Sequence, residues 1–275
     1  MLKTCGAISV PIWDDGMVTY SLSLETLEYY LIILIRVASF FYTAPFFGMQ
    51  NVPGKVKIGL SMVVALLLYY ALPAQTLEYG TVLEYGAVVL KEAAVGIILG
   101  LVANICTNII SFAGRIIDME IGLSMASAFD PVSRENTTIT GTIYNYMVLM
   151  ILMVSNMHHY IISAFCDAYQ LIPMNFSGLH FDRVYLVFTK YLVESILIGF
   201  RIVLPFFCAT LLLNVVLGIL AKVAPQMNMF AVGIQMKVLV GLMIMFLTIS
   251  LLPTVSDFIF TEMKVMVVAA VNAMR

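Results

Sequence analysis

Long apolar stretches separated by short polar connectors dominate the chain. An α-helix needs about 20 apolar residues to cross the hydrocarbon core of a bilayer. Runs near or above that length lie at residues 27–47, 56–72, 85–110, 139–164, 184–220 and 229–252. These runs predict an all-α fold with about six long helices, some of them broken or hairpin-like.

The fifth run is longer than one membrane crossing requires. About 36 helical residues from 184 to 220 would reach roughly 54 Å, against a hydrocarbon core of about 30 Å. Pro205 lies inside this run, where it removes a helical hydrogen bond. The helix is therefore expected either to bend near Pro205 or to extend well beyond the bilayer.

One stretch, Ala113 to Pro131, departs from the helical pattern. From Asp118 to Met125, large apolar side chains alternate with acidic or small ones. On a helix the apolar residues would scatter around the axis, whereas on an extended backbone they share one side. Gly122 adds conformational freedom. We therefore predict an irregular segment between the third and fourth helices.

This irregular segment has two interpretations. Extended backbone at membrane depth must be buried in protein or line a wet cavity, because its polar groups would otherwise go unpaired. Methionine adapts its shape to irregular surroundings. The hypothesis is a flexible, Met-rich segment in or over a passage. The alternative is an ordinary hydrophilic connector outside the bilayer.

Composition fixes the class of protein. Of 275 residues, 62% are apolar and 11% charged, and the mean hydropathy is +1.01. A soluble domain has about 45–50% apolar and about 25% charged residues, so this is an integral membrane protein. The net charge of −2 offers no basic surface for nucleic acid. Cys5, Cys106, Cys166 and Cys208 form no CxxC motif, which favours packed thiols over a metal site.

Several polar residues interrupt the apolar runs. Charges such as Arg36, Glu194 and Arg201 are costly in lipid, so they must face protein or water. They are expected to pair with each other or with neighbouring subunits, and contacts within the chain are the alternative. Both termini would lie on one side of the membrane after six crossings. The distribution of Lys and Arg between the connectors does little to decide which side of the membrane this is. We take it to be the outside.

The third run carries two features that helices use to associate in lipid. Gly96 and Gly100 are spaced so that another helix can approach closely. Asn104 and Asn108 lie four residues apart on one face, and we expect them to bond a neighbouring helix.

The sequence offers little enzyme chemistry. Gly122-Leu123-Ser124 has a passing likeness to the Gly-x-Ser element of intramembrane serine proteases, with His158 or His159 as the base. The irregular position of Ser124 argues against this interpretation. The histidine pair is not HExxH, and neither a P-loop nor GxGxxG occurs. We predict no enzyme, no cofactor and no metal.

Four stretches point to one family. They are RVASFFYTAPFFGMQNVPGKVKIGLSM, AGRIIDMEIGLSMASAFDP, SNMHHYIISAFCDAYQLIPMN and LGILAKVAPQMNMFAVGIQMKVLVG. In this order, from about Arg36 to about Pro253, they resemble the FliR family, the R subunit of the bacterial flagellar type III export gate. The chain departs from the family at Asn156-Met157-His158, usually Asn-Gly-His, and at Gln235, commonly proline.

The resemblance implies a non-enzymatic subunit of a multi-pass complex in the bacterial inner membrane, within the flagellar basal body. It would assemble with P and Q subunits into a closed helical gate through which unfolded flagellar proteins pass. FlhB-type and FlhA-type export components would be further partners. Residues 1–183 would form a P-like part, and residues 184–275 would form a Q-like helical hairpin.

The resemblance also implies residue roles. A pore plug would lie within residues 113–135, and Met119, Ile121, Leu123, Met125 and Phe129 would form a deformable apolar seal. Its complete predicted set is Met119, Ile121, Gly122, Leu123, Ser124, Met125, Phe129, Asp130 and Pro131. The predicted interface or buried polar residues are Arg36, Asn104, Asn108, Asn156, His158, Glu194, Arg201, Asn214, Gln226 and Asn228.

Two other functions remain open from the sequence. The homologous gate subunit of a virulence injectisome would share the fold and the pore. A small-molecule secondary transporter would show a matched inverted repeat, and the sequence shows none.

Overall fold

The fold is helical, as predicted. The computed structural model describes residues 8–9, 19–20, 24–49, 52–72, 79, 81–124, 138–172, 174 and 181–274. Within these ranges the only strands are β1 (Ile8–Ser9) and β2 (Thr19–Tyr20), which pair antiparallel. The helices are α1 (Leu24–Thr43), α2 (Gly54–Ala71), α3 (Val82–Ile121), α5 (Ile139–Val154), α6 (Met157–Leu171), α7 (Phe181–Val223), α8 (Met229–Ile249) and α9 (Leu252–Met274).

The predicted number of membrane crossings agrees with these helices. Among the described residues, five helices are long and apolar enough to cross a membrane, and a bent pair would make a sixth. The bent pair is α5 and α6, which meet at 69°. The fourth run is therefore not one helix, because Asn156 takes a left-handed backbone conformation with φ of 56° and breaks it.

The chain folds into two compact units that interleave along the sequence. One contains residues 1–101, 165–180 and 274–275, and the other contains residues 102–164 and 181–273. Helices α3 and α6 each contribute to both units. The boundary after residue 183, which came from the resemblance to two different subunits, stays a prediction.

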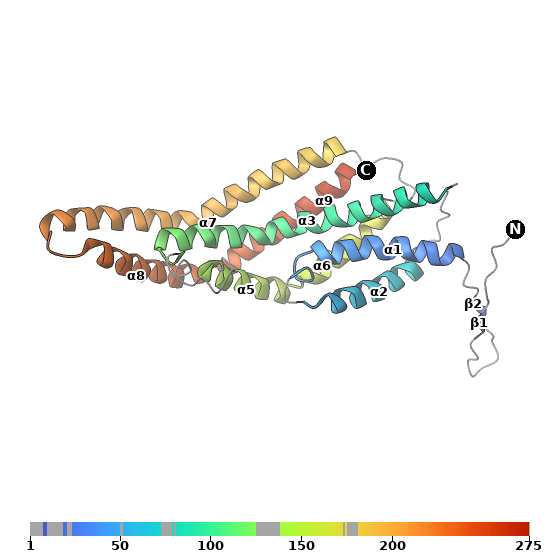
Figure 1. Cartoon of the computed structure of the whole chain (residues 1–275), viewed down its shortest axis with the longest axis horizontal. Coiled ribbons are helices and arrows are strands. Elements are labelled where there is room, and N and C mark those ends of the chain that lie inside the picture. The colour runs from blue at the N-terminus through green and yellow to red at the C-terminus, as the bar shows by residue number, and fades with distance from the viewer. Residues whose placement is uncertain are drawn as a thin grey trace. The chain divides into compact units, whose positions relative to one another are not determined.

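In the first unit, the start of α3 approaches α1 closely. A side-chain carbon added at Gly96 would collide with Ser39 and with the Arg36 backbone, and one at Gly100 would collide with Thr43. The two glycines therefore admit α1 against α3, which confirms the predicted helix–helix contact. Helices α1 and α2 also lie side by side in this unit (Figure 1).

In the second unit, α7 and α8 form an antiparallel hairpin (Figure 1). Asn228 begins α8 and accepts a hydrogen bond from the Ala231 backbone N–H at 3.4 Å. Helix α7 has 43 residues and continues through Pro205, and its axis changes direction along its course (Figure 1). At 1.5 Å per residue it is about 65 Å long, longer than predicted.

The last apolar run ends earlier than expected. Helix α8 stops at Ile249, and Pro253 lies in the first turn of α9 rather than ending the preceding helix. Proline is tolerated there because its missing N–H would have had no partner within the helix. The predicted short C-terminal helix is 23 residues long.

Candidate functional site at the end of helix α3

The first residues of the predicted irregular segment are helical. Asp118 to Ile121 continue the last turns of α3, so the extended backbone predicted for these residues is wrong. Ile117 and Ile121 are four residues apart and both buried, while Met119 is 71% exposed. The alternation in sequence therefore arises from a buried helical face. That face contains Asp118 beside Ile117 and Ile121, and the Asp118 carboxylate has a buried hydrogen-bond partner.

That partner is the first turn of α5. The Thr140 backbone N–H donates to both Asp118 carboxylate oxygens, at 3.2 and 3.3 Å. The first N–H groups of a helix have no partner within the helix, and Thr138, at the N-cap, makes no side-chain capping bond. Asp118 therefore caps α5 from another helix, and its negative charge is favourable at that end of the helix dipole.

Two close helix contacts surround this cap. The backbones of Gly114 on α3 and Gly141 on α5 lie so near each other that a side chain on Gly114 would collide. Ile121 is buried against Gly241 of α8, where an added side-chain carbon would meet its atoms. The end of α3 is thus fixed from two sides by helices α5 and α8.

Helix α3 ends in a turn at Gly122. This glycine has φ of +90°, a conformation that residues with a side chain rarely adopt. Leu123 and Ser124, which follow, are half-buried. Of the predicted plug residues, the structure therefore brings Met119 to Ser124 together at one helix end. Met125, Phe129, Asp130 and Pro131 lie outside the described residues.

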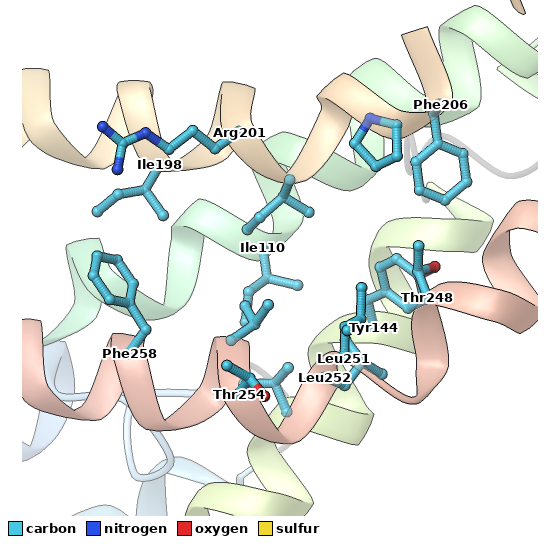
Figure 2. Close-up of a pocket in the computed structure, with 14 residues that line it drawn as sticks. Ile110, Tyr144, Ile198, Arg201, Phe206, Thr248, Leu251, Leu252, Thr254 and Phe258 are labelled. Carbon is cyan, nitrogen blue, oxygen red and sulfur yellow. The ribbon is translucent and has the colours of Figure 1, made fainter. Parts of the chain in front are cut away.

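An apolar pocket lies elsewhere in the same unit. It has a volume of about 380 Å³, and Figure 2 shows side chains of several helices converging on it. Its lining residues are Ile110, Tyr144, Val148, Ile198, Arg201, Ile202, Pro205, Phe206, Thr248, Leu251, Leu252, Thr254, Val255 and Phe258. Tyr144 and Thr248 bond each other through their hydroxyls at 2.6 Å, so these two polar groups already have a partner.

Arg201 is the charged residue of this pocket lining. Its side chain is exposed, and no described carboxylate lies within ion-pair distance of it. Its guanidinium lies at the edge of the pocket near Ile198 (Figure 2). Pro205 also lines the pocket and has no N–H, so it cannot donate to the Arg201 carbonyl four residues earlier.

In the first unit, the other predicted arginine has the opposite environment. Arg36 is 1% exposed and forms an ion pair with Glu92 of α3. Its guanidinium also donates to the Ile172 carbonyl at 3.1 Å and lies 4.4 Å from the Tyr169 ring centroid. Of the two alternatives predicted for Arg36, a neighbouring subunit or a contact within the chain, the structure therefore has the contact within the chain.

Two further predicted contacts are also internal. The Asn108 amide donates to the Asn104 side-chain oxygen at 3.3 Å, along α3 itself, and the expected bond to a neighbouring helix stays a prediction. Glu194 of α7 lies close enough to Glu262 of α9 for its charge to act on that carboxyl group. Burial, and then the adjacent Glu194, raise the pKa of Glu262 above its ordinary value, while Lys190 opposes the shift.

The remaining predicted polar residues are not brought together. Asn156 forms the break between α5 and α6, and the adjacent His158 has a buried Nδ1 with no partner among the described residues. Asn214 and Gln226 are exposed, and Asn228 caps α8. Among the described residues no group of three or more metal-ligating side chains occurs.

Sequence reasoning missed three residues that organise these contacts. Asp118 was assigned to an extended segment, Glu92 was not recognised as the partner of Arg36, and Gly241 was not singled out. A partial signal was present for Glu92, because it is an acidic residue within an apolar run and such residues pair with opposite charges. For Gly241 no local signal exists.

Comparison with known proteins covers most of the chain. Residues 27–263 match the family described as Bacterial export proteins, family 1. "Flagellar biosynthetic protein FliR" of Bacillus subtilis is 29% identical over 84% of this chain and 90% of its own length. The protein of the same name from Escherichia coli is 29% identical over 87% and 91%. That from Buchnera aphidicola subsp. Acyrthosiphon pisum is 32% identical over 78% and 83%.

Proposed function

Because the chain belongs to the bacterial export proteins of family 1, we propose that it is a structural and gating subunit of the flagellar type III export gate. It would form part of the pore through which unfolded flagellar proteins leave the cell. The names of the relatives favour a flagellar over an injectisome system. In this proposal the chain catalyses no reaction during protein export.

The end of α3 carries the gating part of this proposal. A seal for unfolded chains of any sequence must be apolar, deformable and anchored. Met119 offers an exposed, adaptable side chain, and Gly122 supplies the turn that ends α3. Asp118 and its bond to Thr140 hold the two flanking helices at a fixed separation. Such an anchor would let the segment move without displacing the helices.

The partners follow from the family resemblance. The P and Q subunits would surround the chain, with FlhB-type and FlhA-type components nearby in the basal body. The hairpin of α7 and α8 supports a Q-like role for residues 184–275, because large apolar side chains along both helices are exposed within the single chain. Apolar surface of that extent is covered by lipid or by other subunits.

The decisive experiment removes the proposed seal. Deletion of residues 122–127 should raise the ion conductance of membranes that contain the assembled gate, because the apolar closure is lost. Secretion of flagellar subunits is measured in the same strain. A conductance equal to that of the wild type would rule out the plug role.

A matched pair of substitutions tests the seal without shortening the chain. Met119 and Met150 are 71% and 72% exposed, and both lie in helices of the second unit. Met119→Ser should increase ion leakage, whereas Met150→Ser should leave it unchanged. Equal leakage from both variants would show that any exposed methionine has this effect and would contradict the assignment.

Gate membership is tested separately. Gentle solubilisation followed by mass determination of the intact complex should give one defined assembly that contains this chain with P and Q subunits. Recovery of the chain as a stable monomer, with those subunits present in the cell, would contradict the proposal.

A further inference from the structure

The pocket beside Arg201 has the chemistry of a lipid site. Its interior is apolar, the Tyr144 and Thr248 hydroxyls satisfy each other, and a guanidinium stands at its edge (Figure 2). A ligand that matches this arrangement has a hydrocarbon chain at one end and an anionic group at the other. We propose that the pocket binds one anionic phospholipid, with an acyl chain in the cavity and the phosphate on Arg201.

The position of Arg201 along α7 supports a headgroup at this point. The 22 residues from 202 to 223 carry a single charge, Lys222, and would extend about 33 Å, close to the hydrocarbon thickness of a bilayer. The preceding half of α7 carries Asp182, Arg183, Lys190 and Glu194. Arg201 therefore lies where the membrane-length half of the helix begins, at the depth of lipid phosphates.

The absence of a nearby described carboxylate favours an anionic ligand at Arg201 over an apolar one. An arginine at a membrane boundary requires water or a counter-charge, and no described carboxylate supplies one. Basic sites between membrane helices recognise anionic headgroups, and guanidinium binds phosphate through two parallel hydrogen bonds.

Pro205, four residues after Arg201, adds a second polar feature, which is a backbone carbonyl without its usual donor. Because Pro205 cannot donate a hydrogen bond, the Arg201 carbonyl has no donor at its usual helical position. The hydroxyl groups of a phosphatidylglycerol headgroup are donors. Such donors match an acceptor that the helix leaves without its usual partner.

The cavity suits the other end of the same molecule. Its volume of about 380 Å³ lies within the range of about 300–1,000 Å³ typical of pockets for small ligands. Ile110, Val148, Ile202 and Phe206 line it with hydrocarbon. The residues that line the pocket all belong to the second unit of the chain, so the site does not depend on the gating role proposed above.

The test measures lipid retention by native mass spectrometry of the full-length chain in detergent, titrated with phosphatidylglycerol or phosphatidylcholine. The wild type should retain one phosphatidylglycerol in preference to phosphatidylcholine. Arg201→Gln should weaken retention about tenfold or more, because charge-assisted hydrogen bonds are lost. Arg183→Gln, an exposed arginine on the same helix outside the pocket, should leave it unchanged.

A second variant tests the cavity rather than the charge. Ile202→Phe keeps Arg201 but fills space in the pocket, so it should also reduce phosphatidylglycerol retention. Thermal unfolding of each variant verifies that the chain is folded. Unchanged retention in Ile202→Phe would mean that the headgroup binds at the surface alone, and this would overturn the pocket assignment.

Two other outcomes would overturn the proposal. Equal retention of both lipids would show that charge plays no part. If the assembled complex holds no phosphatidylglycerol and Arg201→Gln prevents its assembly, then a partner subunit and not a lipid occupies the site. Neither outcome bears on the plug, whose readout is ion conductance.

Discussion

Two arginines inside apolar helices have opposite environments. Arg36 is buried and its guanidinium contacts Glu92, the Ile172 carbonyl and the Tyr169 ring. Arg201 is exposed at the edge of an apolar pocket, and no described carboxylate is within ion-pair distance of it. In sequence both are arginines within a long apolar run.

The difference separates structural charges from charges that are available to ligands. A buried ion pair whose partners fold together serves the stability of the chain, and its removal leaves an uncompensated charge. An exposed charge at membrane depth contributes little to folding and must find its counter-charge outside the chain. The same residue type therefore belongs to the core in one unit and to a binding surface in the other.

The largest effect is expected at the buried ion pair. Arg36→Met should destabilise the protein by about 3–5 kcal/mol, because Glu92 is left buried without its partner. Thermal unfolding in detergent measures the loss. The double variant Arg36→Met with Glu92→Leu should recover much of it. A double variant no more stable than the single one would show that the charges are not the cause.

A smaller effect is expected at the cap between α3 and α5. Asp118→Ala should cost about 1–3 kcal/mol, because the Thr140 N–H loses its acceptor in a buried position. Asp118→Asn keeps an acceptor without the charge and should cost less. Unfolding by heat or denaturant ranks the two variants. Equal losses would mean that the volume of the side chain matters and not its hydrogen bond.

The like-charged pair Glu194 and Glu262 predicts a weak dependence on pH. Because burial and Glu194 raise the pKa of Glu262 in the folded state, the folded protein holds this proton more tightly than the unfolded one. Stability should therefore be highest below the ordinary carboxyl pKa and should fall as the pH rises through the raised value. Glu194→Gln should flatten this dependence in melting curves taken across that range. A dependence that survives this substitution would assign it to other groups.

The smallest effect on folding is expected at Arg201. Arg201→Gln should change the free energy of unfolding by no more than about 0.5 kcal/mol in lipid-free detergent, as for other exposed substitutions. Arg36→Gln, measured beside it, should be severely destabilised. A loss at Arg201 as large as that at Arg36 would show an internal partner and remove the contrast between the two sites.

Local pattern predicted most of the helices but not their ends. Apolar runs located the membrane-length helices, and the glycine pair at Gly96 and Gly100 correctly predicted a close helix contact. The alternation from Asp118 to Met125 was misleading, because an acidic residue on a helix face resembles a solvent-facing residue until its partner is known. Pro253 was taken as a stop, although proline also begins helices.

The sequence by itself determined that this is an all-helical membrane protein of the bacterial export family, because hydropathy and motif order are properties of the linear chain. Only the tertiary structure decided which polar residues are paired. Arg36 and Glu92 are 56 residues apart, and Asp118 and Thr140 are 22 apart. Such pairings depend on which helix faces meet in space, and the composition of a single helix does not record its neighbour.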